Sequence, residues 1–150
     1  MTRAIELAAE NMRLGRGGPF AALVVRGGEI IASGANLVTS ANDPTAHAEI
    51  VAIRAACRAL GGFQLAGCDI YTTCEPCPMC LGAIYWARPA RVYFAGTSGD
   101  AAEAGFDDSF IYGEVSKPWP ERTIPMIPRM RRAALGLFRE WRAAPGRVAY

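Results

Sequence analysis

Strong charge of either sign and long apolar runs are both missing from this 150-residue sequence. Its 16 basic and 14 acidic residues leave a formal charge of +2, and Lys117 is the only lysine. So small an excess gives no strong electrostatic attraction to nucleic acid. An apolar run such as residues 20–25 is far shorter than the roughly 20 residues that a membrane-spanning helix needs. We therefore expect neither a nucleic acid nor a membrane as partner.

The first twenty residues also lack the apolar core segment of an export signal, because charges occur throughout them. Five cysteines are an odd number, and a disulfide framework is not expected in a chain of this size without such a signal. The sequence therefore predicts a cytoplasmic protein with reduced thiols. Apolar residues make up 51% of the chain and charged residues 20%, which excludes disorder and predicts a single domain over residues 1–150.

Local patterns predict helices and strands that alternate along the chain. Apolar residues at helical spacing predict an amphipathic N-terminal helix: Ile5, Ala8, Ala9 and Met12. Further helices are expected at residues 47–60, 77–86, 106–115 and 130–143, and strands at residues 20–25, 29–33, 68–73 and 91–95. A polar loop is expected at residues 39–45, and an irregular segment with four prolines at residues 117–128. The alternation predicts an α/β domain.

One set of residues has the composition of a zinc site. His47 is the only histidine, Glu49 follows two residues later, and Cys77 and Cys80 come thirty residues on. An imidazole and two thiolates give zinc three protein ligands and leave the fourth tetrahedral position open, as in catalytic sites. The pattern H-x-E followed by P-C-x-x-C is the signature of zinc deaminases, in which the glutamate transfers protons. We therefore predict one zinc ion per subunit on His47, Cys77 and Cys80, with Glu49 as the catalytic residue.

Each of these residues has a simpler explanation when it is taken alone. A C-x-x-C pair can be a redox dithiol, a single histidine can be a packed or surface residue, and Glu49 can be a charge favoured at a helix start. The combination favours zinc, because Cys77 and Cys80 share one helix face and both motifs are expected to begin helices. Cys57 and Cys68 are expected to be buried core thiols, and Cys74, which precedes the second helix, is expected to be structural.

Four segments resemble the bacterial guanine deaminases of the cytidine deaminase superfamily. They are NDPTAHAE, CEPCPMCLGAIYWARP, AAEAGFDDSFIY and ERTIP, which begin at Asn42, Cys74, Ala101 and Glu121. The zinc motif is common to the superfamily, whereas GFDDSFIY and the terminal Tyr150 are more particular. The resemblance implies a three-layer α/β/α fold with a mixed sheet of about five strands flanked by helices.

The resemblance also implies a set of purine-pocket residues: Phe20, Asn36, Ala48, Trp86, Asp108 and Tyr150. Asn36 can donate to and accept from a base edge, and Asp108 can accept hydrogen bonds from ring N–H or amino groups. Aromatic side chains can pack on a flat ring. Simpler explanations stay open, because the aromatic residues can belong to the core and both Asp107 and Asp108 can cap the following helix.

In the family that the sequence resembles, the C-terminal segment crosses to the partner subunit and closes its active site. The resemblance therefore implies a homodimer that exchanges residues from about 117 to 150 by domain swapping, a low-cost route to dimers. The proline-rich residues 117–128 would be the hinge of this exchange.

The predicted function is hydrolytic deamination of a small purine base, guanine, to xanthine and ammonia by attack at C2. Guanosine, cytosine or a triazine such as ammeline remains an alternative substrate, because the zinc chemistry would be the same. A tRNA adenosine deaminase is less favoured, since RNA binding calls for a basic surface. A non-catalytic zinc protein is a further alternative, against which Glu49 argues, because a structural site needs no proton shuttle.

Overall fold

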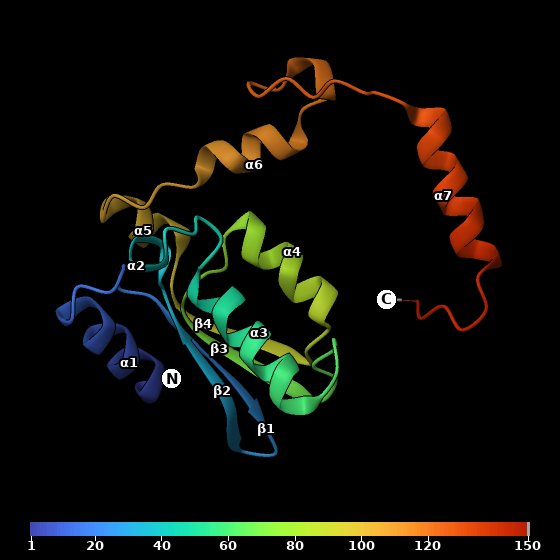
Figure 1. Ribbon diagram of the computed structural model, residues 1–150. Helices are drawn as coiled ribbons and strands as arrows, with labels where there is room; N and C mark the ends of the chain where they lie inside the picture. The colour runs from blue at the N-terminus through green and yellow to red at the C-terminus, as the bar shows by residue number, and fades with distance from the viewer. Residues whose placement is uncertain (150) are drawn as a thin grey trace. The chain divides into compact units, whose positions relative to one another are not determined.

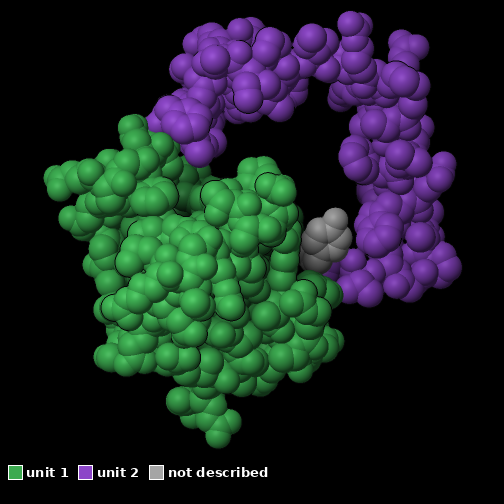
Figure 2. Space-filling model, turned by 60° about the vertical axis from the view of Figure 1, so that its left-hand side comes forward, with its two compact units in different colours: residues 1–109 green, residues 110–150 purple. Residues whose placement is uncertain are grey.

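The computed structural model describes residues 1–149, and the chain divides into two compact units at Ser109 (Figure 2). Tyr150, a predicted pocket residue, lies outside the described residues. The elements follow in this order: α1 (Thr2–Arg13), β1 (Ala21–Arg26), β2 (Glu29–Ala35), α2 (Val38–Ala41), α3 (Ala48–Leu60), β3 (Cys68–Cys74), α4 (Pro78–Ala87), β4 (Arg91–Gly96), α5 (Ser98–Glu103), α6 (Ser109–Ser116), a 3-10 turn (Trp119–Glu121) and α7 (Arg131–Ala143). The prediction of a single domain over residues 1–150 stays a prediction.

The first unit is built on a mixed sheet with the strand order β2-β1-β3-β4 (Figure 1). β1 pairs antiparallel with both β2 and β3, while β3 and β4 are parallel and are joined through α4. The β1–β2 hairpin turns at Gly27 and Gly28, whose φ angles of 59° and 86° suit glycine in such a turn. The four predicted strands are confirmed.

Helices cover both faces of this sheet, α1 on one face and α3 with α4 on the other (Figure 1). The predicted three-layer α/β/α arrangement is thereby confirmed. Burial of apolar side chains between the sheet and the α3–α4 layer provides the main favourable contribution to folding. That core includes Ala22, Val24, Ala52, Ile53, Ile70 and Ile84.

The predicted sheet of about five strands is wrong, because the sheet of the described residues has four. After β4 the chain turns into α5. Thr97 and Asp100 form a capping box, in which Asp100 Oδ2 accepts from Thr97 N at 2.7 Å and Thr97 Oγ1 accepts from Asp100 N at 3.2 Å. This pair satisfies two backbone N–H groups at a helix start and so favours helix over a further strand. Further on, the prolines of residues 117–128 cannot donate ladder hydrogen bonds.

The predicted N-terminal helix is confirmed as α1, but its buried face differs from the apolar pattern. Ala4, Ala8 and Asn11 are buried at the spacing i, i+4, i+7, whereas Ile5 and Met12 are 52% and 51% exposed. The polar Asn11 occupies a position on the buried face that a hydrophobicity pattern assigns to the solvent side.

The longer predicted helices agree with the structure, and the differences concern the short helices α2, α5 and α6. Residues 47–60, 77–86 and 130–143 are confirmed as α3, α4 and α7. The helix expected from residue 106 begins at Ser109, the polar loop at residues 39–45 contains part of α2, and α5 was not predicted. These are helices of four to eight residues, which capping contacts and tertiary packing rather than sequence periodicity define.

The second unit contains most of α6, the 3-10 turn and α7. None of the side chains described within residues 110–149 is buried. On α7, Leu137, Phe138 and Trp141 are each at least half exposed. No described helix combines the length and apolarity that crossing a membrane would require.

We expect the substitution Gly34→Ala to destabilise the first unit. A Cβ at Gly34 in β2 would lie 2.3 Å from Ala48 O and 2.4 Å from Ala52 N, and both are backbone atoms of α3. The whole helix would have to shift, which typically costs about 1–3 kcal/mol of folding free energy. Urea denaturation followed by circular dichroism measures this loss.

Gly62→Ala is the matched control for that substitution. An added methyl there meets no atom within 4 Å, and the φ of Gly62 lies outside the left-handed region. Its stability should change little or rise slightly. Equal stability of the Gly34→Ala and Gly62→Ala variants would contradict the close packing of β2 on α3.

Candidate active site

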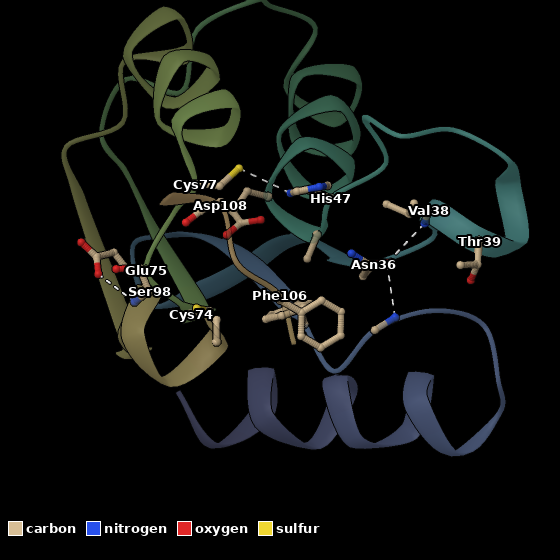
Figure 3. A pocket seen from close by; sticks show the side chains of 15 residues that line it. Asn36, Val38, Thr39, His47, Cys74, Glu75, Cys77, Ser98, Phe106 and Asp108 are labelled. Carbon is tan, nitrogen blue, oxygen red and sulfur yellow. Dashed lines mark hydrogen bonds between the residues drawn. The ribbon is translucent and has the colours of Figure 1, made fainter. Parts of the chain in front are cut away.

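The predicted metal ligands lie where the N-termini of α3 and α4 meet (Figure 3). His47 is the N-cap residue of α3 and Cys77 is the N-cap residue of α4, and both have extended backbone angles. Pro78 begins α4, a position that suits proline because the first helical N–H needs no partner within the helix. Cys80 follows within the first turn and is buried.

The donor atoms of these three residues fit one zinc ion. His47 Nδ1 lies 3.5 Å from Cys77 Sγ and 3.6 Å from Cys80 Sγ, and the ligand atoms of all three residues lie within 4.8 Å of one another. Tetrahedral zinc with ordinary Zn–S and Zn–N bond lengths holds sulfur and nitrogen about 3.6 Å apart. The set supplies three ligands of the types that zinc prefers and leaves a fourth position for another ligand.

The pKa values of the three ligand side chains shift in different directions. Interaction with the Cys80 side chain lowers the pKa of Cys77 to about 4, assisted by His47 and by the Cys80 backbone N–H at 3.5 Å. Interaction with Cys77, together with burial and the nearby Glu49, raises the pKa of Cys80. The hydrogen bond with Cys77 also raises the pKa of His47 above 6.5. Cys77 is therefore a ready thiolate, while Cys80 keeps its proton until a metal displaces it.

Glu49 lies in the first turn of α3 and is only 6% exposed. Its Oε1 accepts a hydrogen bond of 2.9 Å from Thr72 Oγ1 on β3, and its Oε2 lies 3.4 Å from the Cys80 thiol, which donates to it. One carboxylate oxygen is therefore fixed by the sheet and the other faces the ligand cluster.

A cavity of about 250 Å³ opens beside this cluster, within the first unit. Its walls come largely from the segments before and after the strands rather than from the strands themselves. The predicted site residues that line it are Phe20, Asn36, His47, Ala48, Glu49, Cys77 and Asp108 (Figure 3).

Asn36 presents one defined side of its amide to the cavity. Its Oδ1 accepts hydrogen bonds from the backbone N–H groups of Gly18 and Val38, each at 3.3 Å (Figure 3). With the oxygen engaged in this way, the NH₂ group is the part of the amide that remains to contact a ligand. Nearby, Phe20 packs edge-to-face on Phe106, with ring centroids 4.9 Å apart.

The two neighbouring aspartates before α6 have different roles. Asp107 Oδ1 accepts a hydrogen bond of 2.8 Å from Ser109 N, the local capping contact that was one alternative for both residues. Asp108 instead lines the cavity, where burial raises the pKa of its carboxyl group. Asp108 is thus placed to accept a hydrogen bond from a bound ligand.

Two predicted substrate-binding residues are not among the described residues that line the cavity. Trp86 lies on α4, is 62% exposed and is not among the described residues that line the cavity. Tyr150 lies outside the described residues. Both assignments stay predictions.

Two residues of the site were not predicted: Thr72, which holds Glu49, and Phe106, which lines the cavity. A third, Asn11, hydrogen-bonds Gly18 O and Asn36 O behind the cavity wall. Phe106 lies inside the segment GFDDSFIY, which the resemblance had already marked. Thr72 and Asn11 act through partners distant in sequence, so no local pattern indicates them. Cys74, expected to be structural, is buried and also lines the cavity, and burial raises its pKa to about 11.

Comparison with known proteins agrees with this geometry. Residues 1–96 match the family model described as the cytidine and deoxycytidylate deaminase zinc-binding region. Guanine deaminase of Bacillus subtilis is 56% identical over 150 residues, which are all of this chain and 96% of that protein. The chain belongs to the guanine deaminase family of zinc-dependent deaminases. Membership confirms the predicted family, the hydrolase class and the zinc cofactor.

Solved structures of the guanine deaminase family give the same result. The crystal structure of the Bacillus subtilis guanine deaminase superposes with a TM-score of 0.97 and covers 99% of this chain and 95% of that one. A guanine deaminase from Nitrosomonas europaea is 32% identical, with a TM-score of 0.69 over 95% of this chain and 82% of that one.

Among sequence relatives, a tRNA-specific adenosine deaminase of Agrobacterium fabrum is 47% identical, but over only 58% of this chain and 59% of that protein.

We expect zinc affinity to fall with decreasing pH in two regimes. Cys77, with its pKa of about 4, is already a thiolate near neutrality, whereas Cys80 must release its proton to bind. Below the raised pKa of His47 the imidazolium must lose a proton as well. The affinity should therefore fall about tenfold per pH unit above that pKa and about a hundredfold below it. Competition with a chromophoric chelator between pH 5.5 and 8.5 measures the slope.

The change of slope should occur above pH 6.5, because the His47 pKa is raised from that value. Cys57→Ser is a suitable control, since this half-buried thiol is not part of the ligand cluster. A single slope over the whole range, or a break below pH 6.5, would contradict the proton distribution described above.

Proposed function

We propose that this chain deaminates guanine to xanthine and ammonia. The similarity to Bacillus subtilis guanine deaminase over the whole chain carries the proposal. The tRNA-specific adenosine deaminase of Agrobacterium matches little more than half of the chain, so it accounts for less of the sequence. Guanosine, cytosine and triazines would use the same zinc chemistry, and they are the substrates against which the proposal is tested.

In this proposal His47, Cys77 and Cys80 bind the zinc ion and Glu49 moves the protons. Their donor types and mutual distances support the ligand assignment. When bound, zinc acts as a Lewis acid that brings the pKa of a water molecule toward neutrality. Thiolate ligands need a reducing compartment, so we also propose the cytoplasm as the location.

Glu49 is placed to carry two protons in turn. Its Oε2 faces the ligand cluster, while Thr72 holds its Oε1. The carboxylate takes a proton from the attacking water and passes it to a ring nitrogen as the new C2–O bond forms. It then passes the second water proton to the amino group as the C2–N bond breaks. Guanine and water thus give xanthine and ammonia, and Glu49 ends as a carboxylate.

The cavity offers groups that complement a purine base. Guanine presents acceptors at O6 and N7 and a donor at its amino group. The NH₂ group of Asn36 can donate to an acceptor, and Asp108 can accept from a ring N–H or amino group. Phe20 and Phe106 provide apolar surface for the ring. Ala48, fully buried at the start of α3, completes the wall beside Glu49.

Ammonia release tests the proposed activity directly. We expect the zinc-loaded protein to release ammonia from guanine with a higher kcat/KM than from guanosine, cytosine, adenine or ammeline, and to form xanthine in equal amount. Glu49→Gln should lose about 10²- to 10⁴-fold in kcat, because a proton shuttle contributes this much, while zinc content stays at one per chain.

Glu103→Gln, an exposed glutamate at the end of α5, is the matched control and should keep full activity. If the protein and the control variant both prefer another of these rings, guanine is not the substrate. An active Glu49→Gln variant would instead remove the proposed mechanism.

We also propose that the protein is a homodimer whose C-terminal segments are exchanged. Apolar side chains of α4 and β4 lie on the surface, among them Tyr85 at 76% and Phe94 at 48% exposure. The second unit likewise buries none of its described side chains, although α7 is amphipathic. Apolar patches of this kind mark association surfaces. A second copy of the chain carries the same two apolar surfaces, one on α4 and β4 and one on α7, so each copy can cover those of the other. In such an exchange Tyr150 would belong to the partner's cavity.

Mixing two inactive variants tests the exchange. One carries Glu49→Gln with an intact C-terminus, and the other ends at Pro128 with an intact catalytic residue. If the C-terminal segment completes the partner's cavity, refolding the two together should restore activity, because the Glu49→Gln chain supplies its segment to the intact site. Because each mixed dimer contains one intact site of two, activity should approach half of the parent activity multiplied by the fraction of mixed dimers that sedimentation measures.

Refolding the truncated chain with a chain that carries both changes is the control, and it should stay inactive. Full activity of the truncated chain alone would contradict a role for the segment. Mixed dimers without activity would contradict the exchange.

A further inference from the structure

A buried polar side chain on α1 has no part in the proposed chemistry. Asn11 is 4% exposed and continues the buried face that Ala4 and Ala8 begin. An apolar residue would suit this position against the sheet, because burial of an amide costs free energy unless its hydrogen bonds are satisfied. The side chain therefore calls for a structural explanation.

Asn11 connects two segments that form one wall of the cavity. Its Nδ2 donates one hydrogen bond of 2.8 Å to Asn36 O and another of 3.3 Å to Gly18 O. Gly18 and Asn36 are also joined directly, since Gly18 N donates to Asn36 Oδ1 at 3.3 Å. The Asn11 amide thus binds the backbone carbonyls of both Gly18 and Asn36, the two residues that the Gly18 N–Asn36 Oδ1 hydrogen bond joins.

The same two segments approach too closely to leave room for a side chain. A Cβ at Gly17 would lie 2.1 Å from Asn36 O and 2.9 Å from Asn36 Oδ1. The carbonyl that accepts the stronger bond from Asn11 is therefore also fixed by packing. Together these contacts define where the Asn36 amide lies and which side it presents to the cavity.

We propose that Asn11 is a positioning residue that sets the orientation of Asn36 for recognition of the substrate edge. The inference rests on the proposed function, in which the NH₂ group of Asn36 donates to an acceptor on the purine. The side-chain amide of Asn11 donates to Gly18 O and Asn36 O, which are backbone atoms of the cavity wall rather than parts of His47 or Glu49. Its removal therefore weakens substrate binding while proton transfer and metal binding remain.

The expected result for Asn11→Ala is a rise of about tenfold in KM for guanine with kcat within about twofold of the parent, the pattern of a lost binding contact. Zinc content should stay at one per chain. Gly17→Ala should give the same pattern, because its methyl group displaces Asn36 O. Ala8→Gly is the matched control, since it weakens α1 on the same buried face without touching Asn36.

A double-mutant cycle separates positioning from general destabilisation. In an Asn36→Ala background, Asn11→Ala should raise KM no further, because the group that it positions is gone. Additive effects in the double variant, or a KM for Asn11→Ala no different from that of Ala8→Gly, would overturn the inference.

A second measurement does not depend on the activity. In the ¹⁵N NMR spectrum, the side-chain amide of Asn36, identified by its loss in Asn36→Ala, should shift in Asn11→Ala and in Gly17→Ala but not in Ala8→Gly. An unmoved resonance overturns the positioning role even if guanine is the substrate. A shifted resonance in a protein that leaves guanine intact supports it and rejects the proposed substrate instead.

Discussion

The meeting of two helix N-termini at one point is the constraint on which the site depends. His47 caps α3 and Cys77 caps α4, so each ligand leaves the chain where a helix presents unpaired N–H groups and partial positive charge. That charge favours a thiolate over a thiol. The close contact of β2 with α3 at Gly34 and the parallel β3–α4–β4 connection hold both helices on the same face of the sheet (Figure 1).

Metal binding and the readiness of Glu49 are linked through Cys80. In the structure the Cys80 thiol donates its proton toward Glu49 Oε2, while Thr72 holds Oε1. A cysteine binds zinc as a thiolate, so that proton is released when the metal binds. Glu49 Oε2 then no longer accepts a hydrogen bond from Cys80 and is free to accept a proton on the side that faces the ligand cluster. A buried carboxylate with one oxygen fixed and the other freed in this way is suited to carry protons.

The sequence indicates the ligand cluster because its main signals are local. His47, Glu49, Cys77 and Cys80 lie in two short motifs, and helical spacing and turn residues correctly indicated the strands and the longer helices. The two site contacts that the sequence did not reveal, those of Thr72 and Asn11, join distant segments. Asn11 looks like a solvent-side residue of α1, yet its partners are Gly18 and Asn36. The fifth strand was expected from a family pattern, whereas the Thr97–Asp100 capping box turns the chain into a helix.

The ligand cluster lies within the segment that the family model matches, whereas part of the cavity wall comes from residues beyond it. The family model ends at residue 96 and includes all three ligand residues and Glu49. Phe106 and Asp108, by contrast, reach the cavity from the segment after α5, beyond that limit. The wall that carries Asn36 lies within the model but is held by α1 through a single buried amide. Substitutions in these surrounding segments can therefore reshape the cavity wall without moving His47, Cys77, Cys80 or Glu49.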